Sequence, residues 1–185
     1  MQVKNKGLMS QMSHFDELIA TVEEYQTLAA ENYDRIRKLA EELRDGLCDF
    51  MGAKDGVCVH LVPPGGEFKP KEYKDKAFSI PPRGFRPLGP VAFGLAVRVS
   101  RGTDWLRVTM ECRKLGDTFI VQIINGPEYQ FMLPLADNDP QPFYEHIHDH
   151  VRGWFSGGIE RYQEGEYGSR EIGFDFAANA EADKA

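Results

Sequence analysis

The longest regular pattern in the chain is a run of apolar residues, three and four positions apart, in its first third. Its members are Phe15, Leu18, Ile19, Val22, Tyr25, Ala29, Tyr33, Ile36, Leu39, Leu43, Leu47 and Phe50. This spacing keeps the apolar side chains on one face of an α-helix. Ser13 stands before the run as a capping residue, and Gly52 follows it. The pattern therefore predicts a single helix over residues 14–51.

Five later segments have the composition and the turn signals of β-strands. They are residues 56–62, 91–100, 105–113, 118–124 and 128–133. Asn125-Gly126 separates the last two, and this pair is the strongest short signal of a β-hairpin because type I′ turns need positive φ at both positions. The order predicts an α+β fold, in which a long N-terminal helix and a C-terminal helix flank an antiparallel five-stranded sheet. That sheet consists of one strand, a long loop and a four-stranded meander.

The second helix is predicted from a shorter apolar stripe near the end of the chain. Its residues are Phe143, Ile147, Val151, Trp154 and Phe155. We expect Gly157-Gly158 to end or break this helix. A length of 185 residues fits one domain with tails. The predicted organisation is a flexible tail over 1–13, a single domain over 14–164, and a loose acidic tail over 165–185.

The segment between the first two strands, residues 63–90, is too rich in proline for a helix or a central strand. It holds seven of the eleven prolines, and its six basic and three acidic residues give it a net charge of +3. The remainder of the chain carries −10, since the whole carries −7. Basic residues interleaved with aromatic ones are typical of surfaces that grip acidic partners. We therefore predict contact with an acidic protein through Lys69, Lys71, Tyr73, Lys74, Lys76, Arg83, Phe85 and Arg86. The alternative is a loop that packs its aromatic side chains onto its own domain.

The first helix is too long for the domain that it belongs to. The 36 residues from Phe15 to Phe50 span about 54 Å as one helix, whereas a body of this size is only about 40 Å across. A straight helix would project with part of its apolar stripe in water, and a second copy of the chain is the simplest cover. We therefore predict a homodimer formed through Phe15, Leu18, Ile19, Val22, Tyr25 and Asn32. The competing account is a bend near Ala29-Ala30 that folds both halves onto the sheet.

One strand has an almost bare face, made by Ala92, Gly94 and Ala96. Small residues allow a helix, a ligand or another backbone to approach closely. One of the two long helices is the expected cover.

Sequence motifs of catalysis and cofactor binding are missing, and we assign no catalytic residue and no cofactor. His146 and His150 lie four apart on a helix, but without a third ligand we predict no metal site. Cys58 and Cys112 occupy inward strand positions and are expected to be reduced core residues, which favours a cytoplasmic location. No apolar run is long enough for a membrane span. The net charge of −7 argues against nucleic acid as a partner.

Three hypotheses about function follow. The first is a non-catalytic interaction or adaptor protein that acts as a homo-oligomer. The second is a small-molecule sensor with a ligand between sheet and loop, because the layout resembles PAS, GAF and profilin-type sheets, and also small acidic secretion chaperones, in architecture only. The third is an enzyme of unknown chemistry. An exposed apolar helix face would favour the adaptor. A pocket large enough for a ligand would favour the sensor. Converging titratable groups with shifted pKa values would favour the enzyme.

Overall fold

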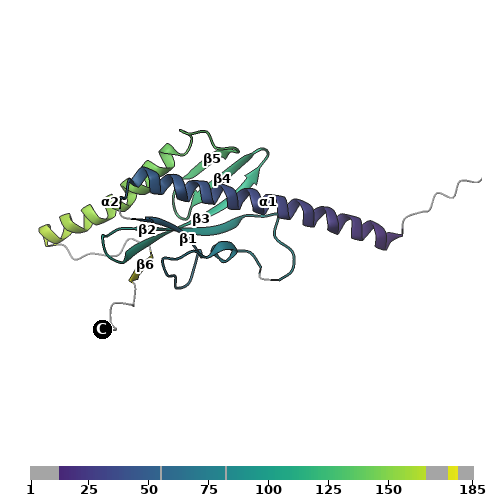
Figure 1. Ribbon diagram of the computed structural model, residues 1–185, viewed down its shortest axis with the longest axis horizontal. Helices are drawn as coiled ribbons and strands as arrows, with labels where there is room; N and C mark the ends of the chain where they lie inside the picture. The colour runs from purple at the N-terminus through teal and green to yellow at the C-terminus, as the bar shows by residue number, and fades with distance from the viewer. Residues whose placement is uncertain (1–12, 55, 82, 166–174, 179–185) are drawn as a thin grey trace, which may run out of the picture.

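The computed structural model of the protein describes residues 13–54, 56–81, 83–165 and 175–178. Its elements are α1 (His14–Met51), β1 (Val59–Val62), the short 3₁₀ helix η1 (Lys74–Ala77), β2 (Val91–Arg98), β3 (Asp104–Leu115), β4 (Thr118–Ile123), β5 (Glu128–Met132), α2 (Gln141–Glu164) and β6 (Asp175–Ala178). Strands β1 to β5 form an antiparallel sheet in sequence order, which confirms the predicted α+β fold (Figure 1). Among the described residues, no helix is long and apolar enough to cross a membrane.

The main core lies between α1 and one face of the sheet. Leu39, Leu43 and Leu47 of α1 have no exposed surface, and they belong to one buried cluster with strand residues such as Phe93 and Met110. Phe143 and Ile147 of α2 join the same cluster. The apolar stripe that predicts α1 is therefore the face that α1 lays on the sheet, but only from Ala29 onward.

The opposite face of the sheet is covered by the proline-rich loop, so the prediction of a covering helix is wrong. Phe68 of the loop packs with Val62, Ala96 and Trp105 in a second buried cluster. Arg107 of β3 crosses the bare part of this face. A Cβ at Gly94 would lie 2.9 Å from Cδ of Arg107. The small residues of β2 are thus needed because an arginine side chain and a loop lie directly on them.

Helix α1 is a single straight helix, and its N-terminal part projects beyond the sheet (Figure 1). Its start is fixed by a capping box: the Ser13 hydroxyl accepts from the Asp16 N–H, and the Asp16 carboxylate accepts from the Ser13 N–H, both at 3.1 Å. None of the residues 14–28 is buried, and Ala29 is the first that is. The account in which both halves of the helix pack on the sheet is therefore wrong.

The end of the chain differs from its prediction in two places. Helix α2 continues through Gly157-Gly158 to Glu164, because two glycines weaken a helix by only about 1 kcal/mol each and helix-forming residues follow them. Residues 175–178 of the predicted loose tail form β6, which pairs with Asp104–Arg107, the part of β3 that β4 leaves open. Residues 1–12, 166–174 and 179–185 of the two predicted tails lie outside the described residues.

Candidate functional site

The part of α1 that projects from the domain, residues 14–28, is here called the projecting segment. Phe15 is 68% exposed, Leu18 58% and Ile19 39%. Tyr25 and Leu28 are also exposed, and Val22 is half-buried. These residues follow each other at helical spacing, so they form one apolar stripe. No other part of the described structure covers it from Phe15 to Ile19. Five of the six residues predicted for self-association belong to this stripe.

The polar side of the projecting segment is acidic. It carries Asp16, Glu17, Glu23 and Glu24, and it contains no lysine or arginine. Hydrogen bonds from Ser13 lower the pKa of Asp16, so its carboxylate is ionised at neutral pH. The segment therefore combines an apolar stripe with a charge of −4.

The base of the projecting segment is supported by the end of the proline-rich loop. The ring of Phe85 meets the ring of Tyr25 edge to face at a centroid distance of 6.2 Å. The Leu88 N–H donates to the Tyr25 hydroxyl at 3.4 Å. These contacts place the loop beside the point at which α1 leaves the domain.

The proline-rich loop is also fastened to α1 by its middle part. The hydroxyl of Tyr33 donates to the Asp75 carboxylate at 2.9 Å, and Arg37 donates to the same carboxylate at 3.3 Å. Burial, and then the bond to Asp75, raises the pKa of Tyr33 far above its usual value. The guanidinium of Arg86 lies 4.4 Å from the centre of the Tyr33 ring. Arg86, one of the predicted partner-binding residues, thus contributes to the packing of its own domain.

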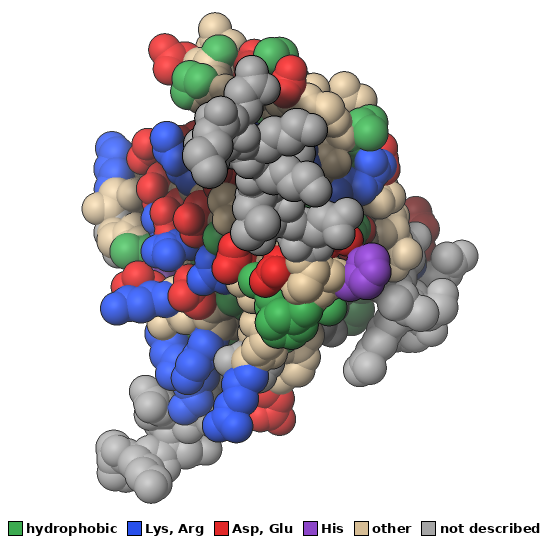
Figure 2. Space-filling model, turned by 90° about the vertical axis from the view of Figure 1, so that its right-hand side faces the viewer, with side chains coloured by type: hydrophobic (Ala, Val, Ile, Leu, Met, Phe, Trp, Pro, Cys, Tyr) green, Lys and Arg blue, Asp and Glu red, His purple; other side chains and the backbone are tan. Residues whose placement is uncertain are grey.

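The other aromatic and basic residues of the loop divide between its two interpretations. Phe68 and Phe78 are buried, and the half-buried Tyr73 accepts a hydrogen bond from the Lys69 N–H at 2.9 Å. In contrast, the basic side chains of Lys69, Lys71, Lys74, Lys76 and Arg83 are exposed. Figure 2 shows Lys and Arg side chains gathered in the lower part of one end of the molecule, with few acidic ones among them. The loop packs its buried aromatics inward and presents its charge outward, and its contact with an acidic protein stays a prediction.

A cleft lies where α1 enters the domain. It has a volume of about 360 Å³ and lies between α1, the loop residue Leu88 and the β3–β4 turn. Asn32 lines it and is only 7% exposed, so this residue is not part of the uncovered stripe. Neither its amide nitrogen nor its amide oxygen has a hydrogen-bond partner in the described part of the chain. In the sequence, Asn32 is visible only as a polar residue within the apolar stripe. That pattern led to a prediction of helix pairing and gave no indication of a cleft.

The charged groups of this cleft come from two elements. Glu31 and Arg35 flank Asn32 on α1, and Lys114 comes from β3. Lys114 alternates with Met110 and Cys112 along β3 and therefore lies on the sheet face that carries α1. Gly116 closes the turn with φ +60° and leaves that wall without a side chain.

Groups suited to catalysis do not converge in the described part of the structure. Burial raises the pKa of the Cys112 thiol to about 12, so this cysteine is no nucleophile at neutral pH. The rings of His146 and His150 stack at 5.8 Å, and burial, with His150 beside it, lowers the pKa of His146. Over residues 13–54, 56–81, 83–165 and 175–178, no three His, Cys, Asp or Glu side chains form a group that could hold a metal ion.

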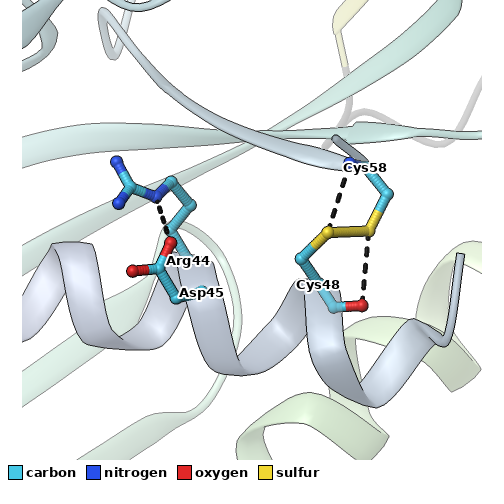
Figure 3. Close-up of a disulfide and its surroundings, with 4 residues drawn as sticks. All are labelled: Arg44, Asp45, Cys48 and Cys58. Atoms are coloured by element: carbon cyan, nitrogen blue, oxygen red, sulfur yellow. Dashed lines mark hydrogen bonds and ion pairs between the residues drawn. A yellow bond between two sulfur atoms is a disulfide. The ribbon is translucent and has the colours of Figure 1, made fainter. Parts of the chain in front are cut away.

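Two of the three cysteines are paired, so the prediction that Cys58 is a reduced core residue is wrong. Cys48 near the end of α1 forms a disulfide with Cys58 just before β1, and their Cα atoms are 5.5 Å apart (Figure 3). The chain reverses between α1 and β1, and this reversal brings Cys48 and Cys58 together. Their separation of ten residues along the sequence does not by itself predict the pairing. Cys112 is the free and buried one. The cytoplasmic prediction, which relied on reduced cysteines, loses that support.

Comparison with known proteins does not assign the chain to a family: it matches no family model, no curated protein and no solved structure.

Proposed function

We propose that this protein is a non-catalytic interaction protein that acts as a homodimer, with the projecting segment of α1 as its dimerisation element. The observation that carries the proposal is the apolar stripe of residues 14–28, which is exposed at Phe15, Leu18 and Ile19 in the described structure. Single apolar residues on a surface are ordinary, but a continuous stripe on a helix that has left its own domain indicates a contact surface. This matches the adaptor hypothesis among the three considered from the sequence.

The exposed apolar surface of the stripe would contribute a large part of the free energy of pairing. Phe15, Leu18 and Ile19 together expose the equivalent of about 1.6 whole side chains. At roughly 1.5–3 kcal/mol for each, their burial in both copies contributes about 5–10 kcal/mol. Tyr25 and Leu28 add to this gain, and association costs about 4–15 kcal/mol. The apolar gain is thus of the same size as the cost of association, so the affinity also depends on the charges of the two segments.

An antiparallel arrangement of the two segments agrees best with their charges. Each segment is about 22 Å long, since its 15 residues rise by 1.5 Å each. Antiparallel pairing brings the acidic tip of one copy to the base of the other, where the basic loop of that copy lies. There, Glu17 of one copy would face the exposed Arg83 of the other. Parallel pairing would instead place the two acidic tips against each other and away from both basic loops. The acidic partner of the loop is, in this proposal, a second copy.

Sedimentation analysis at micromolar concentration tests the dimer. The wild-type protein should have twice the chain mass, and Leu18→Glu with Val22→Glu should give monomers that remain folded. Loss of Leu18 burial in both copies alone corresponds to about 1.7–3.5 kcal/mol, or roughly 15- to 300-fold weaker association. Lys38→Glu, on the same helix but outside the stripe, is the matched control. If the wild-type protein is still a monomer at 100 times the micromolar concentration of this experiment, the proposal is refuted.

A charge exchange tests the antiparallel arrangement separately. Glu17→Arg and Arg83→Glu should each weaken the dimer, because each places like charges together, and the double variant should restore it. Failure of the double variant to recover, with the wild-type dimer intact, would reject this arrangement but leave dimerisation through the stripe in place.

A further inference from the structure

The second half of α2 carries an apolar face that becomes exposed as the helix leaves the core. Phe143 and Ile147 are buried against the sheet, whereas Phe155 is 37% exposed, Ile159 58% and Tyr162 71%. The yellow-green end of α2 extends beyond the strands, at the opposite end of the molecule from the projecting segment of α1 (Figure 1). Exposed apolar residues that repeat on one helix face indicate a contact surface.

Two adjoining hollows form a groove along this face. One, of about 190 Å³, lies between α2, Met51 at the end of α1 and Val97 near the end of β2. The other, of about 340 Å³, lies over residues 154–162 of α2, and Phe155 lines both. The α2 residues that line the two hollows are centred about seven positions apart, which is about 11 Å along a helix. A second helix laid along α2 fits this spacing, because its own residues seven positions apart are separated by the same distance.

The charged residues around the groove are sorted by sign. Three arginines line it: Arg98 from β2, and Arg152 and Arg161 from α2. No acidic residue of the described structure lines either hollow. At about 100° per residue, Arg152 and Arg161 lie on the two flanks of the apolar face, and the acidic residues of this part of α2 lie on the opposite side of the helix. Those acidic residues are Asp149, Glu160 and Glu164. The groove is therefore apolar at its centre and basic at its rim.

We propose that this groove binds an amphipathic α-helix of a partner protein, whose apolar face is flanked by acidic residues. Helices bind apolar grooves through anchor side chains at positions i, i+3 or i+4, and i+7. The first and last anchors would enter the two hollows, and the middle one would pack on Phe155. Carboxylates on the flanks of the partner helix would face Arg152 and Arg161, which would repel a basic helix.

This partner class rests on the proposed interaction function, but the groove itself is independent of the dimer. The projecting segment of α1 and the groove lie at opposite ends of the molecule, so a dimer formed through α1 leaves both grooves accessible (Figure 1). Such a dimer would present two grooves, and a partner with two acidic helices would bind it with avidity.

A synthetic helical peptide of about 18 residues is the probe, with leucine at every third or fourth position, glutamate beside the leucines and alanine elsewhere. The peptide has no aromatic residue, so the tryptophan fluorescence of the protein reports its binding. Trp154 lines the groove and Trp105 is buried, so Trp154 is the expected source of the change. The full-length protein should bind the peptide saturably, with a Kd of about 0.1 mM or lower. A peptide with lysine in place of glutamate should bind at least about tenfold more weakly.

Substitutions in the groove locate the binding site. Ile159→Glu should weaken binding of the glutamate peptide about tenfold and leave the melting temperature unchanged, because Ile159 is 58% exposed. Arg152→Glu with Arg161→Glu should weaken the glutamate peptide to a similar degree and strengthen the lysine peptide. Lys38→Glu makes the same charge change on α1 outside the groove and should have neither effect.

Three results would overturn the proposal. The first is no saturable response at about 1 mM peptide, ten times the expected Kd. The second is binding that is equal for both peptides or unchanged in Ile159→Glu. The third is a strong fall in the melting temperature of Ile159→Glu without peptide binding to the wild type, since the protein's own chain would then occupy the groove.

The Leu18→Glu, Val22→Glu variant keeps this test distinct from that of the dimer. It should bind the glutamate peptide as well as the wild type does, and binding by its monomers would support both proposals. A wild-type monomer that binds the peptide through the groove would refute the dimer alone. If the variant is still a dimer and Ile159→Glu dissociates it, a second copy occupies the groove, and both proposals are overturned.

Discussion

Replacement of Phe68 by alanine would decide whether the proline-rich loop is a structural cover of the sheet. Phe68 is 7% exposed, packs with Val62, Ala96 and Trp105, and has the Arg107 guanidinium 5.0 Å from its ring centre. Truncation of a buried Phe costs about 3–5 kcal/mol, and the low end applies where a loop can collapse into the space. Loss of the cation–π contact adds about 0.5–2 kcal/mol. We expect a loss of about 3.5–5 kcal/mol, a large part of the 5–15 kcal/mol typical of a domain.

Urea unfolding monitored by circular dichroism measures this loss, and Phe85→Ala is the matched control. Phe85 belongs to the same loop but is 54% exposed, so its truncation should cost about 1 kcal/mol or less. The slope m should stay the same in both variants, since the surface exposed on unfolding hardly changes. A loss below about 1 kcal/mol for Phe68→Ala, or one equal to that of Phe85→Ala, would show that the loop does not hold the sheet face, contrary to our reasoning.

Three further predictions concern stability. Burial lowers the pKa of His60, so the folded protein binds a proton at this site less readily than the unfolded chain does. The free energy of unfolding should therefore fall as pH drops through about 6.5. In urea titrations at several pH values, His60→Phe should reduce this dependence of the free energy on pH. A Cβ at Gly46 would overlap a tyrosine side chain of α2, so Gly46→Ala should lower the free energy of unfolding. Gly153 has open space at its Cβ position, so Gly153→Ala should raise the free energy of unfolding by about 0.5–1 kcal/mol. Cys48→Ser with Cys58→Ser opens a short loop and should lose up to about 3 kcal/mol in the same titrations, while an unchanged midpoint would contradict a stabilising disulfide.

The sequence alone determined α1 and the strands β1 to β5, because their signals are local, whereas β6 and the last turns of α2 were not predicted. The three-four spacing from Phe15 to Phe50 predicts α1, and the structure has it at His14–Met51. Turn residues such as Asn125-Gly126 separate the strands of the meander, which pair in sequence order. Even the projection of α1 followed from its length compared with the size of the domain. Each of these inferences needs only neighbours along the chain and the dimensions of regular structure.

Contacts between distant segments were decided only by the tertiary structure. Periodicity marks Asn32 as part of the apolar stripe, but the approach of Leu88 and the β3–β4 turn makes it the wall of a cleft. The bare face of β2 indicates a close neighbour, and the fold places Arg107 and the loop there instead of a helix. Cys48 and Cys58 look unrelated until the chain reverses between α1 and β1. In each case the partner comes from another element, and the spacing of residues along one element carries no information about what will lie against it.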